Sequence, residues 1–406
     1  MSQVKTLGQI ADVNGLMTDG DWVESKDQDA NGTVRLLQLA DVGVCNFTNK
    51  SSRFMTEERA IELKCTFLEE GDILIARMPD PIGRACIFPG YEKKCVTVVD
   101  VCVLRVDPKE FDNRWLMYMI NSSEFNHQIL EFVSGTTRQR IARKKLEALG
   151  LKCPSLQTQK SIAVVLDKAN QLRKDCHQME QELSSLAQSV FIDMFGDPLT
   201  NPKGFSIRTL KEFYDSDKTG TKCGPFGSAL KKEEFVDFGV PVWNMSNISL
   251  TGEFIDSPTL WITEDKYNDL QAYNVLQGDV IISRAGTVGK MGVIDTKFEK
   301  SLISTNLIRV RFGKELLPLY FVSLMTYCKT RLKRLKVGDD GSFSHMNTGI
   351  LDNLEFPYPP MEVQLKYMKF RESLNHQFSC LNEINRLQES NFNSLMQKAF
   401  KGELNL

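Results

Sequence analysis

The feature that most constrains this chain is an internal repeat. When the sequence is shifted by about 205 residues, segments of its first half recur in the same order in its second half, and such ordered matches indicate a duplicated unit. Since 406 residues are too many for one ordinary hydrophobic core, we expect two similar domains. The clearest match sets residues 70–77 (EGDILIAR) against 277–284 (QGDVIISR); the other matched pairs are 54–58 with 261–265, 146–149 with 351–354, and 154–159 with 359–364.

Each half of the repeat combines strand-like and helix-like patterns. The β-branched runs 96–106 and 302–312 are bounded by Gly, Pro and Asp, which predicts strands. Residues 114–132 and 316–337 have the apolar period of helices. Each half is therefore expected to be an α+β domain.

A different pattern follows each half. Residues 157–195 place apolar or small side chains at alternating spacings of three and four, which predicts a coiled-coil helix, and residues 359–406 carry a less regular helical stripe. Prolines just before both segments mark where the helices start. The residues that we expect to pair the two helices are Ile162, Val165, Leu172, Met179, Leu183, Leu186, Leu374, Phe378 and Leu381.

The two helical segments are expected to pair with each other. If a pseudo-twofold axis relates the duplicated halves, the helices must run antiparallel. The predicted fold class is thus α+β, with two similar domains separated by two long antiparallel coiled-coil helices. A helix over 157–195 would be roughly 58 Å long. The expected division is 1–156 for the first domain, 157–195 for the first helix, 196–358 for the second domain and 359–406 for the second helix.

Composition excludes several classes of protein. No apolar run reaches the length of a signal peptide core or a membrane span, so we expect a cytoplasmic protein. Ten cysteines occur without a C-x-x-C pair, which argues against a zinc site and a disulfide framework. The net charge of −2 does not by itself indicate nucleic-acid binding.

The sequence contains little that resembles a catalytic centre. There is no Gly-x4-Gly-Lys-Ser/Thr phosphate-binding loop, and residues 358–361 (YPPM) lack both outer residues of the Asn/Asp-Pro-Pro-aromatic loop of DNA methyltransferases. Pro79-Asp80 followed by Glu92-Lys93-Lys94 imitates a nuclease metal centre, but the second half has no counterpart. We therefore expect no catalytic residue, no metal and no cofactor.

Taken together, the chain resembles the specificity subunits of type I restriction-modification systems. The resemblance covers nearly the whole chain and depends on the order of the two domains and two helices. It also depends on four phrases: residues 71–75 (GDILI), 154–159 (PSLQTQ) leading into 162–167 (IAVVLD), 194–198 (MFGDP), and 201–205 (NPKGF).

The resemblance implies a function and partners. The two domains would be target-recognition domains that each recognise one half of a split double-stranded DNA target, while the conserved helices set the gap between the halves. The chain would also recruit two methyltransferase subunits and, through them, the endonuclease and translocase subunit. The chain itself would be a non-catalytic part of that enzyme complex.

The expected DNA contacts lie in the segments 135–140 and 341–346 and in the basic runs 138–145 and 329–336. The two segments occupy matching places in the repeat and differ in content, which suits two different half-sites. Arg and Gln pair bidentately with base edges, whereas other cations mostly hold phosphates. The expected DNA-binding residues are Thr137, Arg138, Gln139, Arg140, Arg143 and Lys144 in the first half, and Arg331, Lys333, Arg334, Ser344 and His345 in the second.

Two other functions remain open from the sequence. One is a nuclease that acts alone, which metal-dependent cutting by the purified chain would establish. The other is a coiled-coil scaffold whose end domains bind proteins, which would add no sequence preference to a methyltransferase complex. A solvated helix face is the competing interpretation of both basic runs.

Overall fold

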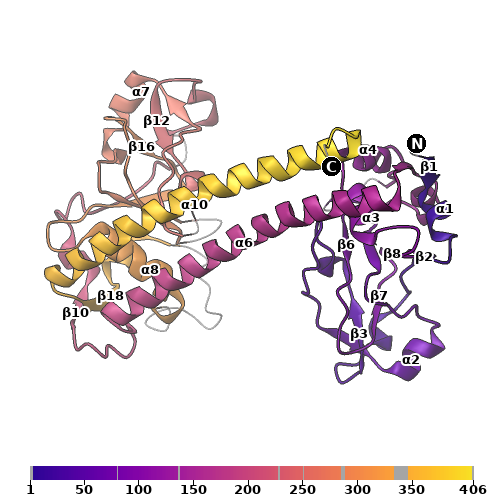
Figure 1. The fold of residues 1–406 in the computed structure, drawn as a ribbon. Coiled ribbons are helices and arrows are strands. Elements are labelled where there is room, and N and C mark those ends of the chain that lie inside the picture. Colours follow the sequence, from indigo (N-terminus) through magenta and orange to yellow (C-terminus); the bar gives the residue numbers. More distant parts are fainter. Residues whose placement is uncertain are drawn as a thin grey trace. The chain divides into compact units, whose positions relative to one another are not determined.

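The structure is a computed structural model that divides into two units (Figure 1). It describes residues 3–79, 81–135, 138–226, 229–249, 251–284, 289–332 and 346–404, with the side chains of 329–332 left out. Unit 1 contains residues 1–177 and 382–406, and unit 2 contains residues 178–381. Among the described residues, no helix is both long enough and apolar enough to cross a membrane.

Unit 1 is built from short strands and helices around the start of one long helix. Its strands form a four-stranded sheet in the order β2-β8-β5-β6, a three-stranded sheet in the order β4-β3-β7, and the pair β1-β9. The elements are β1 (Gln3–Thr6), α1 (Leu7–Ala11), β2 (Leu16–Asp19), β3 (Val34–Leu37), β4 (Arg53–Met55), α2 (Glu57–Glu62), β5 (Ile73–Ala76), β6 (Ala85–Ile87), β7 (Cys95–Thr97), β8 (Val101–Arg105), α3 (Asn113–Ile120), α4 (Ser123–Glu131), α5 (Arg143–Glu147), β9 (Gly150–Cys153) and α6 (Leu156–Phe195).

Unit 2 repeats this topology. Its sheets have the orders β11-β17-β14-β15, β13-β12-β16 and β10-β18, and the pairs β3-β7 and β12-β16 are parallel in their respective units. The elements are β10 (Ser206–Thr209), β11 (Thr221–Cys223), β12 (Val240–Trp243), β13 (Trp261–Ile262), α7 (Glu264–Asp269), β14 (Val280–Ser283), β15 (Met291–Val293), β16 (Leu302–Ile303), β17 (Leu307–Val310), α8 (Pro318–Leu332), α9 (Thr348–Asp352), β18 (Glu355–Tyr358) and α10 (Met361–Lys401). Strand for strand, the two units have the same pairing order, as the sequence repeat predicts.

Some sequence-based element boundaries were wrong. The run 96–106 is not one strand, because a turn before Val101 sends β7 and β8 into different sheets; β16 and β17 divide the run 302–312 in the same way. The helix expected over 114–132 is two helices, α3 and α4. The break lies at Ser122, whose hydroxyl accepts a hydrogen bond from the Phe125 backbone N–H as the N-cap of α4.

The Gly-Asp pairs of the repeat form matching buried ion pairs. Asp72 accepts two hydrogen bonds from the Arg105 guanidinium, at 2.7 and 2.8 Å. In unit 2, Asp279 accepts the same two bonds from Arg311, at 2.8 and 2.7 Å. Both carboxylates are buried, and each also accepts a backbone N–H from three residues earlier. The conserved order of Gly and Asp in the two halves therefore has a structural origin.

We predict that Asp279→Ala destabilises unit 2 strongly. The substitution leaves Arg311 partly buried without its carboxylate, which typically costs about 3–5 kcal/mol. Urea unfolding followed by circular dichroism measures the loss. Asp217→Ala is the matched control because that side chain is 88% exposed, and its effect should stay within about 0.5 kcal/mol. Equal losses in both variants would contradict the assignment.

A buried glutamine joins each long helix to its domain. In unit 1, the Gln159 side chain accepts the Asp112 backbone N–H at 2.9 Å and donates to the Pro154 carbonyl at 3.0 Å. In unit 2, Gln364 makes the equivalent bonds with the Leu317 N–H and the Pro359 carbonyl, at 2.9 and 3.0 Å. An unpaired buried amide is costly, so these bonds fix where each helix starts relative to its domain.

Both long helices contribute to the core of each unit, and in each unit their segments are antiparallel. In unit 1, Arg173 of α6 forms a two-bond ion pair with Glu389 of α10, at 2.7 and 3.1 Å, and its guanidinium lies 4.3 Å from the centre of the Phe392 ring. In unit 2, Phe191 lies 5.4 Å from Tyr367, measured between ring centres. Later residues of α6 thus meet earlier residues of α10.

The side chains that pair the helices differ in part from those expected. Ile162, Leu374, Phe378 and Leu381 are buried, and Val165 and Leu183 are half-buried. By contrast, Leu172, Met179 and Leu186 are exposed by 49%, 55% and 49%, which corrects their assignment to the seam. The residues that follow them turn inward instead: Arg173 pairs with Glu389, and Ala187 is buried.

The correction has a simple physical reason. In a coiled-coil seam, the inward-facing positions alternate between steps of three and four residues. From the same first residue, one possible stripe begins with a step of three and the other with a step of four, and the two stripes differ only at every second position. Because Leu172 is apolar and Arg173 is charged, the sequence favours the first stripe. The structure follows the second, since the long stem of Arg173 packs on Phe392 while its head group reaches Glu389.

We predict that two leucines of unit 2 respond differently to truncation. Leu374→Ala removes a side chain that is 2% exposed and should cost about 2–5 kcal/mol. Leu186→Ala removes a half-exposed side chain and should cost less than about 1 kcal/mol. Chemical denaturation of the two variants checks this difference. A larger loss for Leu186→Ala would restore the stripe expected from the sequence.

Candidate nucleic-acid interface

The first basic run forms a short loop and the start of a helix in unit 1. Arg140 pairs with Ser134 through backbone hydrogen bonds in both directions, at 2.9 and 3.0 Å, which closes the loop. The Arg140 guanidinium lies 3.2 Å from the Asp100 carboxylate and donates to the Val99 carbonyl at 3.3 Å. Arg140 therefore joins this loop to the turn between β7 and β8.

Asp19, at the end of β2, forms ion pairs with two further arginines. Its carboxylate lies 2.9 Å from the guanidinium of Arg77 and 3.6 Å from that of Arg143. Arg143 also donates to the Met17 carbonyl at 3.1 Å and pairs with Glu147 one turn later in α5. Burial lowers the pKa of Arg77, although the nearby carboxylate of Asp19 opposes this effect. Arg77, Arg140 and Arg143 are thus each held by at least one carboxylate.

The other side chains of the run point outward. Arg138, Gln139 and Lys144 are exposed, and within the described part of the chain no ion pair is seen for Arg138 or Lys144. Lys145 lies beside Phe132, with 5.2 Å between its ammonium and the ring centre. The run therefore separates into residues that brace the loop, Arg140 and Arg143, and residues that are available to a ligand.

Sequence reasoning missed an exposed aromatic residue that follows β2. Trp22 is 71% exposed and lies three residues after Asp19. In unit 2, Phe226 is 56% exposed and follows β11, the counterpart of β2. Its ring centre lies 4.7 Å from the guanidinium of Arg284, which follows β14 as Arg77 follows β5. Arg77 and Arg284 are aligned in the sequence repeat. This match is the sequence feature from which the surface after β2 and the surface after β11 could have been found.

Several expected contacts fall outside the described residues. They are Thr137 in the first run and Lys333, Arg334, Ser344 and His345 in the second. Arg331 lies in α8, but its side chain is not described. Asp80 of the nuclease-like motif also lies outside the described residues.

Potential metal ligands do not converge in the part of the chain that the structure describes. No group of three or more His, Cys, Asp or Glu side chains that could hold a metal ion is found there. Eight of the ten cysteines are buried. Burial raises the pKa of the Cys86 and Cys102 thiols to about 12, so these thiols are protonated near neutral pH.

Comparison with known proteins identifies the family. The family model for the type I restriction modification DNA specificity domain matches residues 2–183 and 202–390. The chain is 22% identical over 358 residues to the type I restriction enzyme MjaVIII specificity subunit of Methanocaldococcus jannaschii, covering 84% of this chain and 78% of the relative. It is 21% identical over 353 residues to the putative MjaX specificity subunit of the same organism, covering 83% and 77%.

Solved structures show the same fold. A chain from a study of complex assembly and conformational transition of the type I R-M system superposes with a TM-score of 0.55 at 14% identity, covering 99% of this chain and 98% of that one. The S subunit of a type I restriction-modification system from M. genitalium has a TM-score of 0.53 at 17% identity, with 98% and 96% covered.

The duplicated domains and the two-part match define a DNA specificity protein. The chain belongs to the family of type I restriction modification DNA specificity domains. It is a DNA-recognition subunit, and the interpretations as a nuclease that acts alone or as a protein scaffold find no support.

We predict that two arginines of the first run have separable roles. Arg138→Gln should weaken DNA binding and lower the slope of log K against log salt by about one phosphate contact, because Arg138 is exposed. Arg143→Gln should lower the thermal unfolding temperature, because Asp19 loses a partner. Fluorescence anisotropy at several salt concentrations and calorimetry measure the two effects. An unchanged affinity and salt slope in Arg138→Gln would remove Arg138 from the interface.

Proposed function

We propose that this subunit recognises a bipartite DNA target, with one half-site bound by each recognition domain. The observation that carries the proposal is the pair of units with one topology but different exposed side chains at matching places, Trp22 after β2 in unit 1 and Phe226 after β11 in unit 2. Two domains with one topology present equivalent surfaces to DNA. Different side chains on these surfaces select different bases.

The proposed division of labour follows the sequence. Residues 1–156 and 196–358 act as the two target-recognition domains, and the helices 157–195 and 359–406 set the unread gap between the half-sites. In the first domain, Arg138 and Gln139 contact base edges and Thr137 and Lys144 contact phosphates, while Arg140 and Arg143 hold the loop and the helix start that carry these residues. In the second domain, the proposed contacts are Arg331, Lys333, Arg334, Ser344 and His345.

The subunit contributes recognition rather than catalysis. Two methyltransferase subunits bind it, and an endonuclease and translocase subunit joins through them, on DNA in the cytoplasm. The proposed contact positions for the methyltransferase subunits are exposed apolar side chains of the long helices, among them Leu172, Met179 and Leu186 on α6, and Ile384 and Leu387 on α10.

A domain replacement tests the proposed function. Residues 1–156 are exchanged for the matching domain of the MjaVIII specificity subunit, and the hybrid is expressed with the methyltransferase subunits of this system. Methylated sites in host DNA are then mapped. We expect one half of the target to change, while the other half and the gap length stay as in the wild type.

A second hybrid controls for damage to the assembly. Exchange of residues 196–358 should change only the half-site that the first hybrid leaves intact. If either hybrid changes both half-sites, or if both hybrids methylate the wild-type target, the two domains do not recognise DNA independently.

A further inference from the structure

The two units differ in the charges beside a matching arginine. The backbone N–H of Arg77 donates to the carbonyl of Asp100 at 2.9 Å, and that of Arg284 donates to the carbonyl of Asn306 at 3.0 Å. Asp100 directly precedes β8, and Asn306 directly precedes β17. The two arginines therefore occupy the same place in their units, and Asn306 is the counterpart of Asp100.

The strand register identifies a second matched position. Asp19 of β2 pairs across the sheet with Cys102, and Cys223 of β11 pairs with Ile308. On their other side, Cys102 and Ile308 each pair with the strand residue that lies two positions before the matched arginine. Cys223 is therefore the counterpart of Asp19.

In unit 1, these two positions carry carboxylates that hold arginines. Asp19 lies 2.9 Å from the guanidinium of Arg77, and Asp100 lies 3.2 Å from that of Arg140. Arg77 is only 3% exposed. Its charge is thus compensated inside the unit, and Arg77 supports the fold rather than offering its guanidinium to a ligand.

Unit 2 has neutral side chains at both positions, the thiol of Cys223 and the amide of Asn306. Within the described part of the chain, no ion pair or side-chain hydrogen bond is seen for the half-buried Arg284, and its covered Nη1 atom has no partner. Its guanidinium lies 4.7 Å from the ring centre of Phe226, which is 56% exposed. The charge of Arg284 is therefore not compensated by a carboxylate.

The contact with the ring suits Arg284 to recognise a planar group. An aromatic ring beside a guanidinium restricts the plane in which its N–H groups point. Because Nη1 is covered, the edge formed by Nε and Nη2 is the one left for a ligand. Two parallel donors on such an edge match O6 and N7 of guanine in the major groove, and they also match two oxygens of a phosphate.

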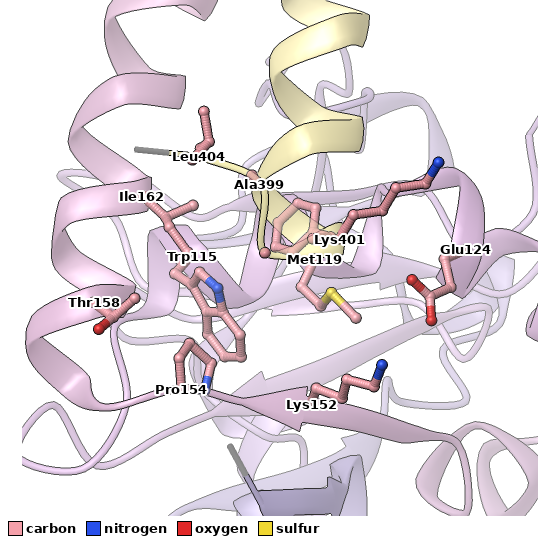
Figure 2. A pocket seen from close by; sticks show the side chains of 12 residues that line it. Trp115, Met119, Glu124, Lys152, Pro154, Thr158, Ile162, Ala399, Lys401 and Leu404 are labelled. Carbon is pink, nitrogen blue, oxygen red and sulfur yellow. The ribbon is translucent and has the colours of Figure 1, made fainter. Parts of the chain in front are cut away.

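The pocket of unit 1 shown in Figure 2 is a site of another kind. It lies where the end of α10 meets the start of α6, and its lining includes Trp115, Met119 and Ile162 of the buried core. None of the described residues that line it is an arginine. The comparison with Arg284 therefore belongs to the surface after β2, where Arg77 has its carboxylate.

We propose that Arg284 recognises a guanine in the half-site bound by unit 2, with Phe226 as the residue that positions its guanidinium. This inference rests on the proposed function, since it assumes that each domain recognises its own half-site. Arg77 makes no such contact, because Asp19 holds it. The same arginine thus has a recognition role in one unit and a structural role in the other.

Arg284→Met tests the base contact in the complex with the methyltransferase subunits. Methylated sites give the target, and the domain exchange identifies the half-site of unit 2. Fluorescence anisotropy then measures binding to duplexes in which one base pair is changed at a time. We expect the variant to lose about tenfold or more of the wild-type preference for guanine at one position of this half-site, and to keep the other half-site and the gap.

The same titrations distinguish a base contact from a phosphate contact. If Arg284→Met keeps the preference at every position while the slope of log K against log salt falls by about one, Arg284 binds a phosphate and the proposal is wrong. An unchanged preference with an unchanged slope would also overturn it.

Cys223→Asp copies the charge of unit 1 and leaves Arg284 in place. The new carboxylate should pair with Arg284 as Asp19 pairs with Arg77, so the same position of the half-site should lose its preference for guanine. Cys223→Ser is the neutral control and should bind as the wild type does. If Cys223→Asp keeps the wild-type preference, or if Cys223→Ser loses it equally, the missing carboxylate does not explain the difference between the units and the proposal fails.

Failure of this inference can be told apart from failure of the proposed function. If exchange of residues 196–358 alters one half-site but Arg284→Met keeps every preference, only the inference fails. If the exchange alters both half-sites, the domains do not act independently and both proposals fail. Circular dichroism checks that each variant is folded, and if Arg284→Met is not, the two Cys223 variants decide.

Discussion

Neither recognition domain has a complete hydrophobic core without both long helices. In unit 1, Ile162 and Leu166 from the start of α6 share one buried cluster with Trp115, and Phe392 and Met396 from the end of α10 belong to the same cluster. In unit 2, the end of α6 and the start of α10 do the same through Phe191, Phe195 and Tyr367. The helices are therefore core elements at both ends rather than rods added to finished domains.

This constraint explains which features the sequence could predict. The repeat of residues 70–77 in 277–284 predicted the duplicated topology, because the Gly-Asp turns and the buried strands after them come with the buried pairs Asp72–Arg105 and Asp279–Arg311. The helix starts were predictable for a similar reason, since a proline and a glutamine five residues later occur in both halves.

Other features depend on contacts between distant residues and could not be predicted from local patterns. The basic run 138–145 looked uniform, but Arg143 pairs with Asp19, which lies far away in the sequence, while Arg138 and Lys144 stay exposed. Spacing alone also could not show that Arg173 replaces Leu172 in the seam, because the choice depends on Glu389 and Phe392 of the other helix.

The composition of the first core also has a consequence for the order of folding. Ribosomes make the chain from its N-terminus, yet Phe392, Met396 and Ala399 belong to the same buried cluster as Leu7 and Ile10. During synthesis, the first domain must therefore expose part of its apolar surface until residues 392–399 have emerged. The second domain, whose core closes with the start of α10, has all its residues available earlier, so the domain made first is the one completed last.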